Sequence, residues 1–89
     1  MAATFFFVGT DEDLLALGRE IRRHRDAKKL SQEKLAERAG LHRNYIGHLE
    51  RGERNPRVKR LFDIARALGL SFAELTAGVI ATKNSRRSK

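Results

Sequence analysis

Four residues within one short stretch have the types and spacing to read base edges in DNA. On a helical wheel of about 100° per residue, these residues, Arg43, Asn44, Gly47 and His48, fall on one half together with Arg51. Arginine can bind guanine O6 and N7, asparagine can pair with adenine N6 and N7, and a neutral imidazole can donate or accept. The stretch therefore predicts a helix with a polar face that suits base pairs in the major groove.

The distribution of charge supports a nucleic-acid partner. The chain has 89 residues and a net charge of +8, with 19 Lys and Arg against 11 Asp and Glu. Residues 19–38, 39–62 and 82–89 each carry a net charge of +4, whereas the first 18 residues carry −3. Such a concentration of positive charge is expected of a phosphate-binding surface, although a basic surface that only favours solubility gives the same composition.

The pattern of apolar residues predicts an all-α fold that positions this face. A helix of about 31–37 begins at Ser31, a good N-cap, and ends at Gly40, which suits a sharp turn at positive φ. The helix that carries the polar face follows over 43–51. Together these two helices form a helix-turn-helix. Further helices are expected at about residues 11–28, 58–68 and 71–78.

Both ends of the chain differ from the middle in composition. Residues 1–9 are expected to form an extended arm, because the apolar run Phe5–Val8 favours extended structure. Residues 10–81 form the expected helix-turn-helix domain. The basic tail 82–89 has no apolar residue and is expected to be flexible.

Several classes of protein are disfavoured by composition. The chain has no cysteine, so a disulfide framework or thiolate metal site is not available. No apolar run approaches the roughly 18 residues of a membrane span, and the first residues do not resemble a signal peptide. A cytoplasmic protein without a membrane partner, metal or other cofactor is the expectation. With one small domain, regulation by protein concentration is simpler than the sensing of a small molecule.

Residues 17–78 resemble the DNA-binding domain of the Xre family, which includes phage Cro proteins and repressors and the controller proteins of restriction-modification systems. The resemblance rests on Arg25, Leu30-Ser31-Gln32, Leu35-Ala36, Ala39-Gly40, Ile46, Leu49-Glu50-Arg51-Gly52, Asn55-Pro56 and Ile64-Ala65-Arg66-Ala67-Leu68-Gly69. It implies a five-helix lambda-repressor-like domain. It also implies a homodimer that regulates transcription by binding a roughly palindromic operator in double-stranded DNA.

The resemblance also implies roles for individual residues. Base contacts are expected from Arg43, Asn44, Gly47 and His48. Gln32 is expected to donate to a phosphate or to brace the first base-reading residue, and Arg25 and Glu50 to form an ion pair between helices. Further phosphate contacts are expected from His42, Tyr45, Arg51, Arg54 and Arg57.

The sequence departs from the family pattern at two caps. His42 stands where Ser or Thr usually caps the base-reading helix, which predicts a weaker cap or a phosphate contact. Arg57 stands where Ser often caps the next helix, so a good cap is exchanged for a phosphate ligand. Neither departure alters the expected fold.

Three other functions compete with this interpretation. An enzyme would draw on His24, His42 and His48, but their spacing does not place two of them on one helical face. An antitoxin that binds both DNA and a toxin could use Phe5, Phe6, Phe7 and Val8 to contact its protein partner, whereas the same run could instead cover its own core or a second subunit. Binding to nucleic acid through charge alone predicts salt dependence with little preference among sequences.

Overall fold

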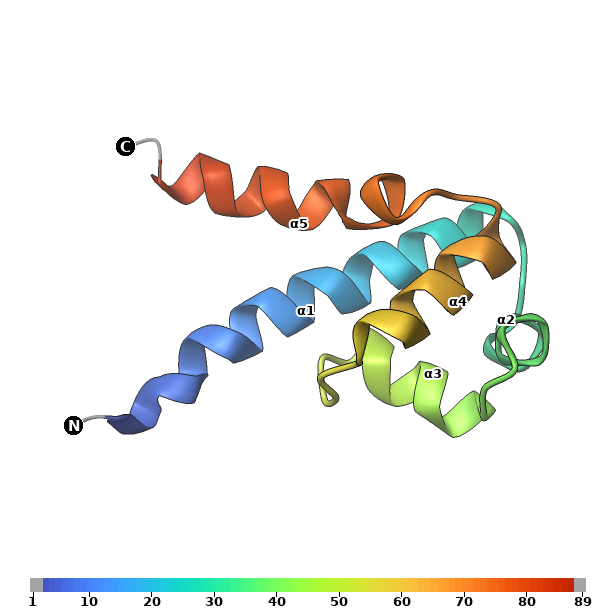
Figure 1. Ribbon diagram of the computed structural model, residues 1–89, viewed down its shortest axis with the longest axis horizontal. Helices are drawn as coiled ribbons and strands as arrows, with labels where there is room; N and C mark the ends of the chain where they lie inside the picture. Colours follow the sequence, from blue (N-terminus) through green and yellow to red (C-terminus); the bar gives the residue numbers. More distant parts are fainter. Residues whose placement is uncertain (1–2, 88–89) are drawn as a thin grey trace.

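Five helices make up the part of the chain that this computed structural model describes, which is the backbone of residues 3–87 and the side chains of residues 12–79. The helices are α1 (Ala3–Ala27), α2 (Gln32–Ala39), α3 (Arg43–Glu50), α4 (Val58–Leu68) and α5 (Phe72–Arg87). Figure 1 shows α5 running beside α1, with α2, α3 and α4 gathered around the C-terminal half of α1. The all-α fold with a helix-turn-helix at α2 and α3 is as predicted.

Local sequence explains most of the helix ends. Ser31 accepts a hydrogen bond from the Lys34 amide at 2.9 Å, and Gly40 ends α2 with a φ of 73°. Ser71 and Glu74 form a reciprocal capping box at the start of α5, with bonds of 3.0 and 2.8 Å. These caps were predicted from the sequence, and the structure confirms them.

Each helix contributes at least one apolar side chain to a single core. The fully buried contributors include Ile21, Leu35, Ile46, Ile64 and Leu75, one from each helix in chain order. Burial of a side chain of this size stabilises the fold by about 1.5–3 kcal/mol. The core therefore attaches both helices of the helix-turn-helix to the rest of the domain.

A close helix crossing sets the position of α3 against α1. A Cβ atom on Gly18 would overlap the carbonyl oxygens of Leu49 and Glu50. Glycine is therefore required for this approach, and α1 acts as a rigid support behind the C-terminal half of α3.

The two ends of the chain differ from the expectation. Residues 3–9 belong to α1 and are not extended, and residues 82–87 continue α5, which was expected to end near Gly78. Once a helix exists, each added residue gains a hydrogen bond without a new nucleation cost, and neither segment contains a proline. Among the described residues, no helix combines the length and apolar character that a membrane crossing requires.

Candidate DNA interface

The turn between α2 and α3 is closed by local hydrogen bonds. The Leu41 amide donates to the carbonyl oxygen of Ala36 at 2.8 Å, immediately after Gly40 reverses the chain. His42 then caps α3, because its Nδ1 accepts a hydrogen bond from the Asn44 amide at 3.1 Å. An imidazole thus replaces the usual hydroxyl as the cap. The expected phosphate contact of His42 stays a prediction.

A buried hydrogen-bond network fixes α3 relative to α1 and α2. Arg25 donates to Glu50 through Nε at 2.6 Å and Nη2 at 3.0 Å, and through Nη1 to the carbonyl oxygen of Leu30 at 2.8 Å. The side chain of Glu50 is 4% exposed and that of Arg25 is 11% exposed. The hydrogen bonds to Glu50 raise the pKa of Arg25. The expected ion pair is therefore present, and it joins α1 to α3.

Gln32 belongs to the same network. Its Nε2 donates to Oε1 of Glu50 at 3.0 Å, so the amide is held between α2 and α3. One amide hydrogen is left for another acceptor. Gln32 thus holds Glu50 at the end of α3, whereas the sequence led us to expect a contact with the first residue of that helix. A phosphate contact through the second amide hydrogen stays a prediction.

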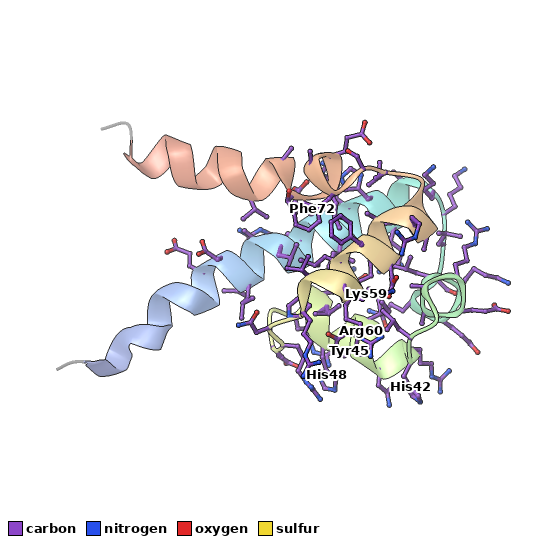
Figure 2. The ribbon with its side chains drawn as sticks, viewed as in Figure 1. His42, Tyr45, His48, Lys59, Arg60 and Phe72 are labelled. Atoms are coloured by element: carbon purple, nitrogen blue, oxygen red, sulfur yellow. The ribbon has the colours of Figure 1, made fainter. Side chains whose placement is uncertain are left out.

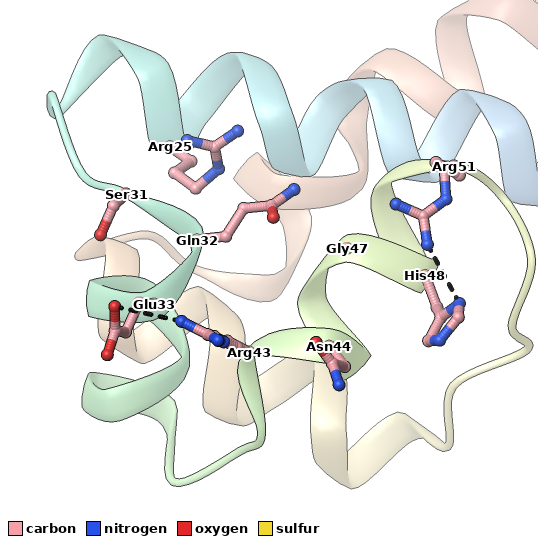
Figure 3. Close-up of a pocket in the computed structure, with 9 residues that line it drawn as sticks. All are labelled: Arg25, Ser31, Gln32, Glu33, Arg43, Asn44, Gly47, His48 and Arg51. Carbon is pink, nitrogen blue, oxygen red and sulfur yellow. Dashed lines mark hydrogen bonds and ion pairs between the residues drawn. The ribbon is translucent and has the colours of Figure 1, made fainter.

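The expected base-contacting residues lie together on one groove between α2 and α3. The groove has a volume of about 770 Å³ (Figure 3). Its lining includes Gln32, Arg43, Asn44, Gly47, His48 and Arg51. Donor groups from both helices therefore face one space, and Arg25 of the Arg25–Glu50 pair lines it as well.

Gly47 lines this groove without placing a side chain in it. A Cβ atom at this position would lie 3.3 Å from Nη1 of Arg51 and 3.5 Å from Oε1 of Gln32. Both atoms are the ends of flexible side chains. The space beside Gly47 is thus shared by two polar side chains, which the sequence pattern did not indicate.

Two acidic residues that sequence reasoning missed pair with the polar groups of the groove. Glu33 lies 3.6 Å from Arg43, and Glu53 lies 2.8 Å from Nδ1 of His48 and 3.1 Å from Nε of Arg51. The hydrogen bonds from His48 and then Arg51 lower the pKa of Glu53. The feature of the sequence that could have indicated Glu53 is Gly52. This glycine is in the left-handed region at φ 74° and turns the chain so that Glu53 faces back toward α3.

A second basic hollow collects other residues expected to contact phosphate. It has a volume of about 490 Å³, and the guanidinium of Arg54 lies 5.9 Å from the ring centroid of Tyr45. The lining includes His42, Tyr45, Arg54, Arg57 and Arg60. Tyr45 and Arg60, both labelled in Figure 2, line this same hollow, and Arg60 was not predicted. Arg57 makes no side-chain hydrogen bond at the start of α4, which agrees with the expected loss of a cap.

The apolar run Phe5–Val8, an expected interaction surface, has its side chains outside the described residues. The same is true of the side chains of residues 82–89. A protein partner at the apolar run therefore stays a prediction.

Comparison with known proteins agrees with this arrangement. A helix-turn-helix family model matches residues 21–75. Control protein C.SmaI of Serratia marcescens is 48% identical over 59 residues, covering 66% of this chain and 70% of that protein. Control protein C.BamHI of Bacillus amyloliquefaciens is 40% identical over 67 residues, covering 74% of this chain and 83% of that protein.

A solved structure extends the agreement to three dimensions. The restriction-modification controller protein C.AhdI from Aeromonas hydrophila superposes with a TM-score of 0.71 at 44% identity, covering 72% of this chain and 97% of that one. Residues 21–75, which the family model matches, include α2, α3 and α4 with the groove between α2 and α3. The chain therefore belongs to the Xre-like helix-turn-helix family of DNA-binding transcriptional regulators.

Proposed function

We propose that the chain recognises a specific DNA sequence by placing α3 in the major groove. The observation that carries this proposal is the shared groove, where Arg43, Asn44 and His48 present donors and acceptors from one helix. The side chain of Arg43 is 63% exposed, and its contact with Glu33 is long at 3.6 Å. An exposed guanidinium with a weak partner can exchange that partner for guanine O6 and N7.

Phosphate contacts would flank this base-reading face. Arg51 and Gln32 lie on the groove itself, while Tyr45, Arg54 and Arg57 lie on the second hollow with His42. Cationic groups on two sides of α3 can bind phosphates of both strands and so set the position of the helix along the DNA. Arg60 joins this set because it lines the same hollow.

The active form in this proposal is a homodimer on a roughly palindromic operator. Two copies of α3 would address half-sites separated by one turn of DNA, roughly 34 Å. Val58 and Phe62 support a second copy as the partner, because they are four residues apart on α4 and are 57% and 43% exposed. Exposed apolar pairs of this kind are available for an interface between subunits.

Binding-site selection from a random DNA pool would test sequence-specific recognition. The expected result is an enriched motif with two-fold symmetry. The Asn44→Ala variant should lose preference at one position of each half-site, by about 1–3 kcal/mol of discrimination. Asn55→Ala is a matched control, because Asn55 lies on the second hollow and should affect affinity without changing preference. Uniform, salt-sensitive binding to all sequences would contradict direct reading.

Light scattering would test the dimer. Val58→Asp places a carboxylate at the first residue of α4, where the helix dipole favours a negative charge, so folding should be preserved. The variant is expected to scatter as a monomer at concentrations where the wild type is a dimer. A dimer that is unaffected by this change would exclude the α4 face as the interface.

The relatives indicate how such a regulator would act. Two of them are named as control proteins, and one solved neighbour is a restriction-modification controller. We propose by this similarity that the chain controls transcription according to its own concentration. Dimer formation would make operator occupancy depend steeply on that concentration.

A further inference from the structure

Three side chains at the end of α3 form a cluster around one imidazole nitrogen. Nδ1 of His48 lies 2.8 Å from Oε1 of Glu53 and 3.2 Å from Nη2 of Arg51. Glu53 also accepts a hydrogen bond at Oε2 from Nε of Arg51 at 3.1 Å. Of the dashed lines in Figure 3, the one between Arg51 and His48 marks their contact.

The two neighbours of Nδ1 require opposite protonation states of His48. A carboxylate accepts hydrogen bonds, so Glu53 can bond to Nδ1 only when Nδ1 carries a proton. A guanidinium donates, so Arg51 can bond to Nδ1 only when Nδ1 carries none. The contact with Glu53 is the shorter of the two, and a carboxylate with a lowered pKa is ionised at neutral pH.

We propose that Glu53 determines the base preference of His48 by holding the proton on Nδ1. This inference rests on the proposed function, because it concerns how α3 reads a base pair. Nδ1 and Nε2 lie at different edges of the ring, and among the described residues none makes a hydrogen bond with Nε2 of His48. Nε2 is therefore the atom that His48 has left to present to a base.

The tautomer decides which bases suit Nε2. With the proton on Nδ1, the neutral ring presents Nε2 as an acceptor, which matches the amino groups of adenine N6 and cytosine N4. With the proton on Nε2 instead, that atom is a donor and matches guanine O6 and N7 or thymine O4. The preferred base at this position should therefore depend on which ring nitrogen carries the proton.

Other charged groups face the same groove but are held by other partners. Arg25 is paired with Glu50, and Arg43 is near Glu33. The closest charged groups to the imidazole are thus Glu53 and Arg51, from the loop after α3 and from its C-cap. These two residues compete for Nδ1. Removal of one should leave the other to decide whether Nδ1 carries a proton.

Glu53→Gln in the full chain tests the proposal. The amide has no charge to retain the proton on Nδ1, so Arg51 should donate to Nδ1 and the proton should move to Nε2. At about pH 8, we compare the affinity for an operator with adenine or cytosine at the His48 position with the affinity for an operator with guanine or thymine there. The ratio of the first affinity to the second should fall about tenfold in Glu53→Gln relative to the wild type. The side chain of Glu53 is 49% exposed, so the substitution should leave the fold intact.

Base preference at the His48 position gives a readout that a merely structural role would not change. Glu53→Gln should prefer guanine or thymine at this position, because its Nε2 is a donor. Glu33→Gln is the matched control, since it removes the same charge beside Arg43 and should retain the wild-type preference at the His48 position.

Nitrogen chemical shifts of the His48 ring would report the tautomer without DNA. The wild type should carry the proton on Nδ1 at about pH 8, and Glu53→Gln should carry it on Nε2. The proposal is overturned when the two proteins show the same tautomer or the same base preference. Loss of all sequence preference in the wild type would instead contradict the proposed function, and so the two failures are distinguishable.

Discussion

Replacing Arg25 with alanine would leave the carboxylate of Glu50 buried without its cation. Glu50 receives three hydrogen bonds from described side chains, two from Arg25 and one from Gln32. Its side chain is 4% exposed, so water has little access to replace the lost donors. The carbonyl oxygen of Leu30 would lose its donor as well.

The expected cost follows from this geometry. Breaking a buried ion pair by removing one partner costs about 3–5 kcal/mol. The remaining bond from Gln32 places the expected loss near the lower value, about 3 kcal/mol. For a domain of this length, each kcal/mol lowers the melting temperature by about 4–8 °C, so the midpoint should fall by about 12–24 °C.

Thermal unfolding followed by circular dichroism would measure this effect. Arg22→Ala is the control, because Arg22 lies on the same helix but its contact with Asp26 is long, at 3.7 Å, and exposed to solvent. Its midpoint should stay close to that of the wild type. Adding Glu50→Gln to Arg25→Ala should recover part of the loss by removing the buried charge. An unchanged midpoint for Arg25→Ala, or no recovery in the double variant, would refute the reasoning.

Three further predictions concern two glycine positions and the pH dependence of one ion pair. Gly18→Ala should lower the free energy of unfolding by about 1–3 kcal/mol, because the new Cβ overlaps two backbone carbonyl oxygens of α3; an unchanged melt would contradict the close crossing. Gly47→Ala should stabilise the protein by about 0.5–1 kcal/mol, because the Cβ meets the flexible end of Arg51 and alanine favours helix; a large loss in the melt would contradict this. The hydrogen bond from Arg23 holds the pKa of Glu20 below its ordinary value of 4.5, so this stabilisation is present above about pH 5 and is lost as pH falls through the folded pKa. Glu20→Gln should therefore show a weaker fall of the melting midpoint between about pH 5 and about pH 3, and an equal fall would count against the pair.

Features set by nearest neighbours in the chain could be predicted well. The Ser31 cap and the reversal at Gly40 depend on one side chain or one φ angle, and both were correctly placed. The bounds of α3 were predicted to within one residue at its end. The ends of α1 and α5 could not be placed in this way, because extending an existing helix depends on no single residue type.

The sequence alone determined that two amphipathic helices meet at Gly40 and that Arg43, Asn44 and His48 share a helix face, because both follow from residue spacing and periodicity. Only the tertiary structure decided which groups these helices contact. The bond between Gln32 and Glu50 joins residues 18 apart in the chain, and Glu53 reaches His48 through a loop conformation that no periodicity encodes. The side chains proposed to read DNA are thus visible in the sequence, whereas the side chains that orient them depend on how distant segments pack.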